Sequence, residues 1–156
     1  MSLSTVEQIT QIRQGRTLVF TNGVFDILHA GHVTYLELAR SLGDLLVVGL
    51  NSDDSVRKLG KGKGRPINTL EDRATVIAAL RCVSGVVAFD EDTPIALLEK
   101  LRPEIHTKGG DYAPQSLPET PLVESYGGKV VVLPFLEGRS TTTILRKLME
   151  PELTED

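Results

Sequence analysis

The fold of this chain is decided by one stretch near its N-terminus, Leu18-Val19-Phe20-Thr21-Asn22-Gly23-Val24-Phe25-Asp26-Ile27-Leu28-His29-Ala30-Gly31-His32. It opens with apolar residues of the kind that fill buried strands, and the pair Asn22-Gly23 is a common turn sequence. After a polar loop, apolar residues recur at helical spacing. We therefore expect a strand over residues 17–22, a turn, and a helix over residues 31–42.

Two histidines, His29 and His32, stand three residues apart where this loop becomes the helix. That spacing places both on one side of the first helical turn. A helix N-terminus offers free N–H groups and partial positive charge, which attract phosphate. Two imidazole donors at that place could hold charge on a phosphoryl group. The same pair could also be surface or packing residues, or metal ligands.

Length and composition indicate one ordinary globular domain. The chain has 156 residues and a net charge of −4, so no overall positive field favours bulk nucleic acid or an anionic membrane. Its one cysteine, Cys82, rules out an internal disulfide and fits a reducing compartment. No apolar run approaches the roughly 20 residues that span a bilayer. The first residues lack the pattern of a signal peptide, so we expect a cytoplasmic protein.

The rest of the chain alternates between apolar runs typical of buried strands and patterns typical of helices. We expect strands at 45–50, 83–89, 104–107 and 129–133, and helices at 69–81, 93–101, within 110–127 and at 141–149. Such alternation predicts an α/β fold, a Rossmann-like doubly wound sandwich with a five-stranded parallel sheet. We expect one domain over residues 16–149, with an N-terminal helix within 1–15 and an acidic tail at 150–156.

Ligands of such sheets bind beyond the carboxyl ends of the strands, where the strand order reverses. The loop after the second strand, residues 58–68, is rich in cations and glycines and is called the flap below. It could be a plain solvated loop, or a mobile cover in which Lys61, Lys63 and Arg65 neutralise a triphosphate. It is not a Walker loop, because the G-x-x-x-x-G-K-[ST] pattern is missing.

Three further places could contact phosphate. Arg73 could do so if its helix begins near the ligand-binding edge of the sheet. Lys108-Gly109-Gly110-Asp111-Tyr112 follows the fourth strand, where Gly-Gly allows close backbone approach, although Lys108 and Asp111 could simply pair. Gly138-Arg139-Ser140-Thr141-Thr142-Thr143 opens the last helix; capping explains one hydroxyl, and the others make a second phosphate cradle.

The string Phe25-Asp26-x-x-His29-x-Gly31-His32 resembles the signature of the nucleotidylyltransferase superfamily, whose members move a nucleoside monophosphate from a nucleoside triphosphate and release pyrophosphate. The wider set resembles the branch that makes ADP-heptose. This likeness rests on residues 21–32 together with Gly49-Leu50-Asn51-Ser52-Asp53, Arg65-Pro66-Ile67-Asn68, Lys108-Gly109-Gly110-Asp111-Tyr112 and Ser140-Thr141-Thr142. It implies AMP transfer from ATP to D-glycero-D-manno-heptose 1-phosphate.

The resemblance also implies roles for individual residues. Catalysis falls to His29, His32 and Lys61. ATP contacts fall to Thr21, Asn22, Gly23, Phe25, His29, Gly31, His32, Ser140, Thr141 and Thr142. The residues that would bind the sugar phosphate are Asp26, Lys61, Arg65, Arg73, Lys108, Gly110 and Asp111. Mg²⁺ would bridge ATP oxygens with few or no protein ligands. A homodimer and a separate upstream sugar kinase are also implied.

Three alternatives stay open. A cytidylyltransferase that uses CTP and glycerol 3-phosphate, or another phosphorylated alcohol, would carry the same signature. A non-catalytic nucleotide sensor on this fold would bind ATP and release no pyrophosphate. A metal-dependent hydrolase would use His29 and His32 as its ligands.

Overall fold

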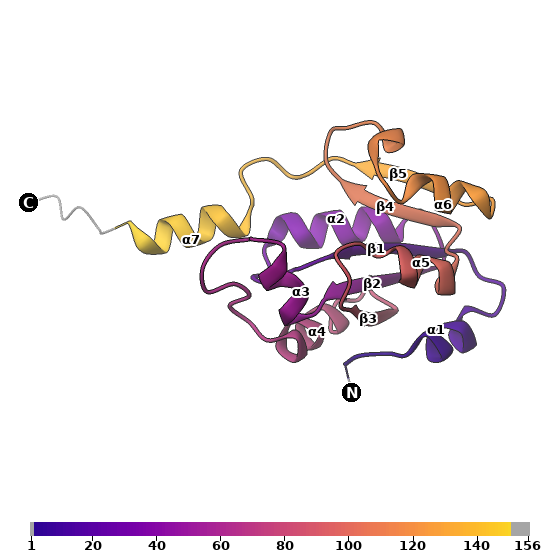
Figure 1. The fold of residues 1–156 in the computed structure, drawn as a ribbon, viewed down its shortest axis with the longest axis horizontal. Coiled ribbons are helices and arrows are strands. Elements are labelled where there is room, and N and C mark those ends of the chain that lie inside the picture. Colours follow the sequence, from indigo (N-terminus) through magenta and orange to yellow (C-terminus); the bar gives the residue numbers. More distant parts are fainter. Residues whose placement is uncertain (1, 151–156) are drawn as a thin grey trace, which may run out of the picture.

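The protein is an α/β sandwich around a five-stranded sheet, as a computed structural model describes it for residues 2–150. The strand order is β3-β2-β1-β4-β5, and every neighbouring pair is parallel. The strands are β1 (Leu18–Gly23), β2 (Leu45–Asn51), β3 (Gly85–Phe89), β4 (Ile105–Gly109) and β5 (Lys129–Leu133). The predicted fold class is therefore confirmed, and the chain changes direction across the sheet between β1 and β4 (Figure 1).

Helices cover both faces of the sheet because side chains alternate along each buried strand. One core joins Leu18 and Phe20 to the apolar sides of α1 (Val6–Arg13), α5 (Ile95–Leu101) and α6 (Thr120–Ser125). The other core joins Val19 to α2 (Ala30–Arg40) and α4 (Leu70–Ala78). The remaining elements are α3 (Asp53–Lys58), the short 3-10 helix η1 (Pro114–Ser116) and α7 (Thr141–Met149), which extends away from the sheet in Figure 1.

Two strands run further than predicted. The pair Asn22-Gly23 is not a turn but the end of β1, paired with Gly49 and Leu50 of β2. Likewise β4 continues to Gly109, which places Lys108 inside a strand. In both cases pairing with a long neighbouring strand outweighs the local preference of Asn or Gly for a turn.

The flap is preceded by a short helix, α3, which the sequence analysis did not predict because its residues are mostly polar. Ser52 caps α3 by accepting a hydrogen bond from the Ser55 amide, and Asp53 and Asp54 occupy its first turn. These are favourable residues for a helix start, but six residues are too few for an apolar period to be recognised. On the far side of the flap, Thr69 caps α4 as predicted, with its hydroxyl accepting from the Asp72 amide.

The N-terminal helix belongs to the same core as the rest of the chain. Ile9 of α1 is fully buried against α5, and the Ser4 amide donates to the carbonyl of Val86 in β3. Arg13 donates to the Leu101 carbonyl at the end of α5. Residues 151–156 of the predicted acidic tail lie outside the described residues. Among residues 2–150, no helix combines the length and apolar composition that crossing a bilayer requires.

Candidate active site

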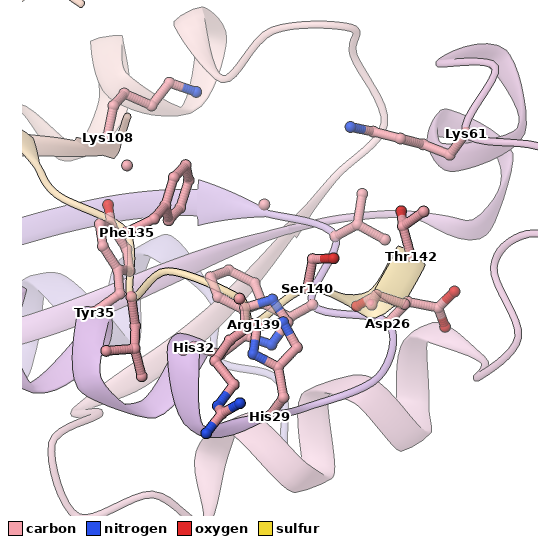
Figure 2. Close-up of a pocket in the computed structure, with 18 of the residues that line it drawn as sticks. Asp26, His29, His32, Tyr35, Lys61, Lys108, Phe135, Arg139, Ser140 and Thr142 are labelled. Atoms are coloured by element: carbon pink, nitrogen blue, oxygen red, sulfur yellow. The ribbon is translucent and has the colours of Figure 1, made fainter. Parts of the chain in front are cut away.

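A cleft of about 630 Å³ opens at the carboxyl ends of β1 and β4, where the strand order reverses. Its walls come from the β1–α2 loop, the flap, the end of β4 and the segment that leads into α7 (Figure 2). The predicted site residues that line it are Asn22, Gly23, Phe25, Asp26, His29, Gly31, His32, Lys61, Arg65, Lys108, Ser140, Thr141 and Thr142. Those that do not line it are Thr21, Arg73, Gly110 and Asp111.

The two histidines form a stacked pair at the start of α2. Their ring centroids lie 3.8 Å apart with an interplanar angle of 21°, and Phe25 packs against His32 at 5.1 Å. His29 is the N-cap residue of α2, so both rings stand beside the free N–H groups of that helix. The Nδ1 atoms of both are buried without a hydrogen-bond partner within residues 2–150. Buried polar atoms without a partner are rare in native proteins, so these two call for a functional explanation.

Burial keeps both imidazoles neutral near pH 7. It lowers the pKa of His32 to about 4, with a smaller contribution from His29. The pKa of His29 is also lowered, first by burial and then by the charge of Arg139. A neutral imidazole has one N–H donor and one acceptor nitrogen, and an adjacent phosphate would favour its protonation.

The lowered pKa values of two histidines, His32 and His106, make the stability of the fold sensitive to acid. Burial also lowers the pKa of His106 in β4 to about 4, from 6.5. Below pH 6.5 the unfolded chain takes up protons at His32 and His106, which the folded chain takes up only near pH 4. We therefore expect full stability above pH 6.5 and a steady loss between pH 6.5 and 4. Melting temperatures of the protein and of His106→Asn across this range test it, and the variant should show a shallower slope.

The N-terminus of α7 lies against the loop between β1 and α2, which ends at His29. The Ser140 hydroxyl caps this helix by accepting from the Thr143 amide at 3.0 Å, and the Thr141 hydroxyl donates to the carbonyl of Ile27 at 3.2 Å. A Cβ atom at Gly31 would lie 2.9 Å from the His29 ring and 3.0 Å from the Cβ of Arg139. Two helix N-termini, far apart in the sequence, therefore meet in one cleft.

The flap is exposed and glycine-rich, but its C-terminal end is firmly tied. Gly60, Gly62 and Gly64 all have positive φ, while Lys61 points into the cleft opposite Lys108 (Figure 2). These glycines adopt backbone angles that other residues reach only with strain. The glycines set the backbone of residues 60–64, whereas the C-terminal end of the flap is fixed by contacts with the rest of the chain.

Asp26 provides that fixed end. Its carboxylate accepts from Arg65 Nε at 2.5 Å and from the amides of Ile67 and Asn68 at 2.9 Å, and Asn68 also donates through its side chain to the Asp26 carbonyl. Burial raises the pKa of Asp26, but the two amides and the guanidinium outweigh it and hold the pKa below its ordinary value. This carboxylate is fully engaged, so we assign Asp26 to the flap rather than to the acceptor.

Arg73 is a buried brace and not a substrate contact. Its side chain is 1% exposed and donates to the carbonyls of Val24, Asn51 and Asn68 and to the carboxylate of Asp53. It thereby joins the loop after β1, the end of β2 and the anchored end of the flap. The predicted contact between Arg73 and substrate does not fit this placement.

We expect Arg73→Met to destabilise the protein by about 3 kcal/mol or more, because several buried carbonyls lose a charged donor together. Urea denaturation measures this effect. Arg57→Met is the matched control, since Arg57 is exposed and pairs only with exposed Asp54. An unchanged urea midpoint for Arg73→Met, combined with a raised KM for the sugar phosphate, would restore the substrate contact.

On the β4 side of the cleft, Lys108 forms a different ion pair from the one the sequence suggested, which was with Asp111. Lys108 pairs with Glu119, at 3.7 Å, and donates to Asn22 Oδ1 at 3.1 Å, whereas Asp111 is exposed and outside the cleft. Tyr112 of the predicted motif lines this side, together with two aromatic residues that the sequence did not single out, Tyr35 and Phe135. The hydroxyl of Thr21 is used inside the core, where it bonds to Tyr35 at 2.8 Å.

Metal ligation by the protein alone finds no support in residues 2–150. In this part of the chain, no three His, Cys, Asp or Glu side chains group closely enough to hold a metal ion. Of the carboxylates that line the cleft, Asp26 is occupied by Arg65 and two amides. The hydrolase alternative therefore lacks a ligand set around His29 and His32 in the described structure.

Comparison with known proteins agrees with this architecture. The model of the cytidylyltransferase-like family matches residues 20–146, and the chain belongs to that family. A relative from Bordetella bronchiseptica, D-beta-D-heptose 1-phosphate adenylyltransferase, is 54% identical over 151 residues, covering 95% of this chain and 93% of that protein. The bifunctional protein HldE of Syntrophotalea carbinolica is 55% identical over 138 residues. That match covers 88% of this chain but only 28% of HldE.

Solved structures show the same fold. The lipopolysaccharide core biosynthesis protein of Thermoplasma volcanium superimposes with a TM-score of 0.64 at 30% identity, covering 78% of this chain and 98% of that chain. Pantoate-beta-alanine ligase of Francisella tularensis superimposes with a TM-score of 0.60 at 17% identity, covering 89% of this chain and 67% of that chain. The second likeness is one of fold alone.

Proposed function

We propose that this protein is an adenylyltransferase that moves AMP from ATP to D-glycero-D-manno-heptose 1-phosphate, giving ADP-heptose and pyrophosphate. The observation that carries the proposal is the meeting of the His29–His32 pair with the N-terminus of α7 in one cleft. The name of the Bordetella relative supports heptose 1-phosphate as the acceptor.

The reaction needs positioning and charge stabilisation more than acid–base chemistry. A phosphate oxygen of the sugar attacks the α-phosphorus of ATP, and the bond from that phosphorus to the bridging oxygen of the β-phosphate breaks. Pyrophosphate leaves with the bonding electrons on the opposite side. The attacking oxygen is already anionic, so the cleft has no need of a strong base.

Each helix N-terminus supplies donors to the triphosphate. His29 and His32 donate to the phosphate oxygens where charge develops. On α7 the first intrahelical amide bond is made by Ile144, so the amides of Thr141 and Thr142 remain as free donors. The hydroxyls of Ser140 and Thr141 are already used in capping and in the bond to Ile27.

Closure of the flap completes the charge balance. Lys61 reaches the phosphates as residues 60–64 bend, while Asp26 holds Arg65 and the flap end in place. If Mg²⁺ takes part, it would arrive with ATP and would have few or no protein ligands, because Asp26 is engaged and no three His, Cys, Asp or Glu side chains of residues 2–150 group around a metal site. Bound to ATP, it would neutralise charge on the phosphates.

A panel of nucleotides and acceptors with a pyrophosphate readout tests the proposal. We expect pyrophosphate release with ATP and heptose 1-phosphate, and much less with CTP and glycerol 3-phosphate. The reverse preference would assign the enzyme to the cytidylyltransferases. ATP binding without pyrophosphate release on any sugar phosphate would instead make it a sensor.

The proposed reaction also implies an upstream enzyme, and the protein is expected to form a homodimer. The acceptor already carries a phosphate, so a sugar kinase must act before this enzyme. A homodimer stays a prediction, which the mass in solution checks directly. The apolar side of α1 packs on its own core through Ile9, so α1 offers less to a partner than the sequence indicates.

A further inference from the structure

The β4 side of the cleft contains a buried carboxylate that the proposed chemistry leaves unused. Glu119, just before α6, is 3% exposed, and its Oε2 atom has no hydrogen-bond partner within residues 2–150. A buried carboxylate with an unpaired oxygen lowers stability, so packing gives no reason for a charge here. Among residues 2–150, the ionic partner of Glu119 is Lys108, with Nζ 3.7 Å from Oε1.

Lys108 stands between the protein interior and the cleft. Its side chain is 20% exposed and lines the cleft, while Nζ donates to Asn22 Oδ1 at 3.1 Å. Two anchors, one anionic and one neutral, therefore fix the direction of the ammonium group. In Figure 2 it points across the cleft toward Lys61 of the flap, on the side away from the histidine pair.

We infer that Glu119 is a positioning residue for Lys108, and that the ammonium groups of Lys108 and Lys61 together form the seat of the acceptor phosphate. The inference rests on the proposed function. The triphosphate has the donors of α2 and α7 besides Lys61, whereas the acceptor phosphate is left with Lys61 and Lys108. These two lysines face each other across the cleft mouth, and the buried carboxylate keeps one of them in place when the site is empty.

The charges around Lys108 explain why a carboxylate is needed. Burial lowers the pKa of Lys108, Glu119 raises it again, and the charge of Lys61 lowers it. His106, two residues earlier on β4, is neutral near pH 7, and Tyr112 lies near Glu119 on the other side. Glu119 is therefore the group that opposes both burial and the repulsion from Lys61.

Glu119→Gln tests this inference, because it removes the charge and keeps the shape. We expect the KM for heptose 1-phosphate to rise about tenfold at neutral pH, the effect of losing one charge-assisted contact, while the KM for ATP changes little. The rise should grow as pH increases, since Lys108 now loses its proton earlier. Glu124→Gln, an exposed change on the same helix, is the matched control and should leave both constants unchanged.

A second variant separates positioning from mere structure. Adding Lys108→Arg to Glu119→Gln supplies a group that stays charged, so the dependence on pH should disappear. If Glu119→Gln raises both KM values alike, or if its effect does not vary with pH, Glu119 has only a structural role and the inference is wrong.

The inference can also fail independently of the proposed function. NMR titration of the Lys108 side chain needs no turnover, and its pKa should fall in Glu119→Gln. Should the pKa stay unchanged, the inference fails even if heptose 1-phosphate is the substrate. If the pKa falls but no sugar phosphate reacts in the unmodified protein, the proposed function fails and the pairing of Glu119 with Lys108 stands.

Discussion

Replacing His32 by alanine is expected to lower kcat by about 10²–10³-fold, the usual effect of removing one donor aimed at charge that develops in the transition state. The ring of His32 is half-buried, stacked on His29 and placed at the start of α2 in the cleft. Its contribution should appear in kcat more than in the KM for ATP, since the charge it holds grows during the reaction. Initial rates of pyrophosphate release at saturating ATP measure it.

A conservative variant makes this result interpretable. His32→Gln keeps a side-chain donor of similar reach, so it should retain more activity than His32→Ala. Melting temperatures of both variants exclude unfolding as the cause. Near-normal turnover in His32→Ala would remove this imidazole from the mechanism and leave the α7 end of the cleft to carry the chemistry.

Replacing Asp26 by alanine should have the largest effect on stability. The change leaves Arg65 without its carboxylate and two flap amides without an acceptor, and breaking a buried ion pair in this way costs about 3–5 kcal/mol. Because the anchored end of the flap is released, trypsin should also cut faster after Lys61 and Lys63. Urea denaturation and the rate of tryptic cleavage measure the two effects.

The matched control for Asp26 lies on α3. Asp54 also pairs with an arginine, Arg57, but both side chains are exposed, so Asp54→Ala should change stability by no more than about 1 kcal/mol. If Asp26→Ala kept its stability and instead raised the KM for the sugar phosphate, Asp26 would be an acceptor contact after all.

The meeting of the N-termini of α2 and α7 in one cleft could be predicted because it follows from strand order. Both the His29 loop and the Ser140 turn follow strands of one parallel sheet, and such strands place their carboxyl ends at one edge. The helix starts were equally predictable, since Ser140 and Thr69 carry local capping signals that need no tertiary information.

What the sequence could not predict depends on long-range geometry. Arg73 has the spacing of a helical residue, but whether it faces a cleft or an interior depends on how α4 crosses the sheet. Glu119 meets Lys108 because of the path that the chain takes between β4 and α6, and no local spacing signals that contact. The pair Asn22-Gly23 reads as a turn until its parallel neighbour β2 is known.

The position of α7 has a consequence for nucleotide affinity. None of its nine residues is buried in the described structure, and nine residues is shorter than the about 12–15 that a helix needs to persist alone in water. Its first turn is held by the Ser140 cap and by the bond from Thr141 to the Ile27 carbonyl. A bound triphosphate would therefore stabilise the first turn of α7 and so promote formation of the helix. The free energy of nucleotide binding would then equal the free energy of the contacts minus the entropic cost of ordering α7. Sequence changes at the distal end of α7 should thus alter affinity without touching any ligand atom.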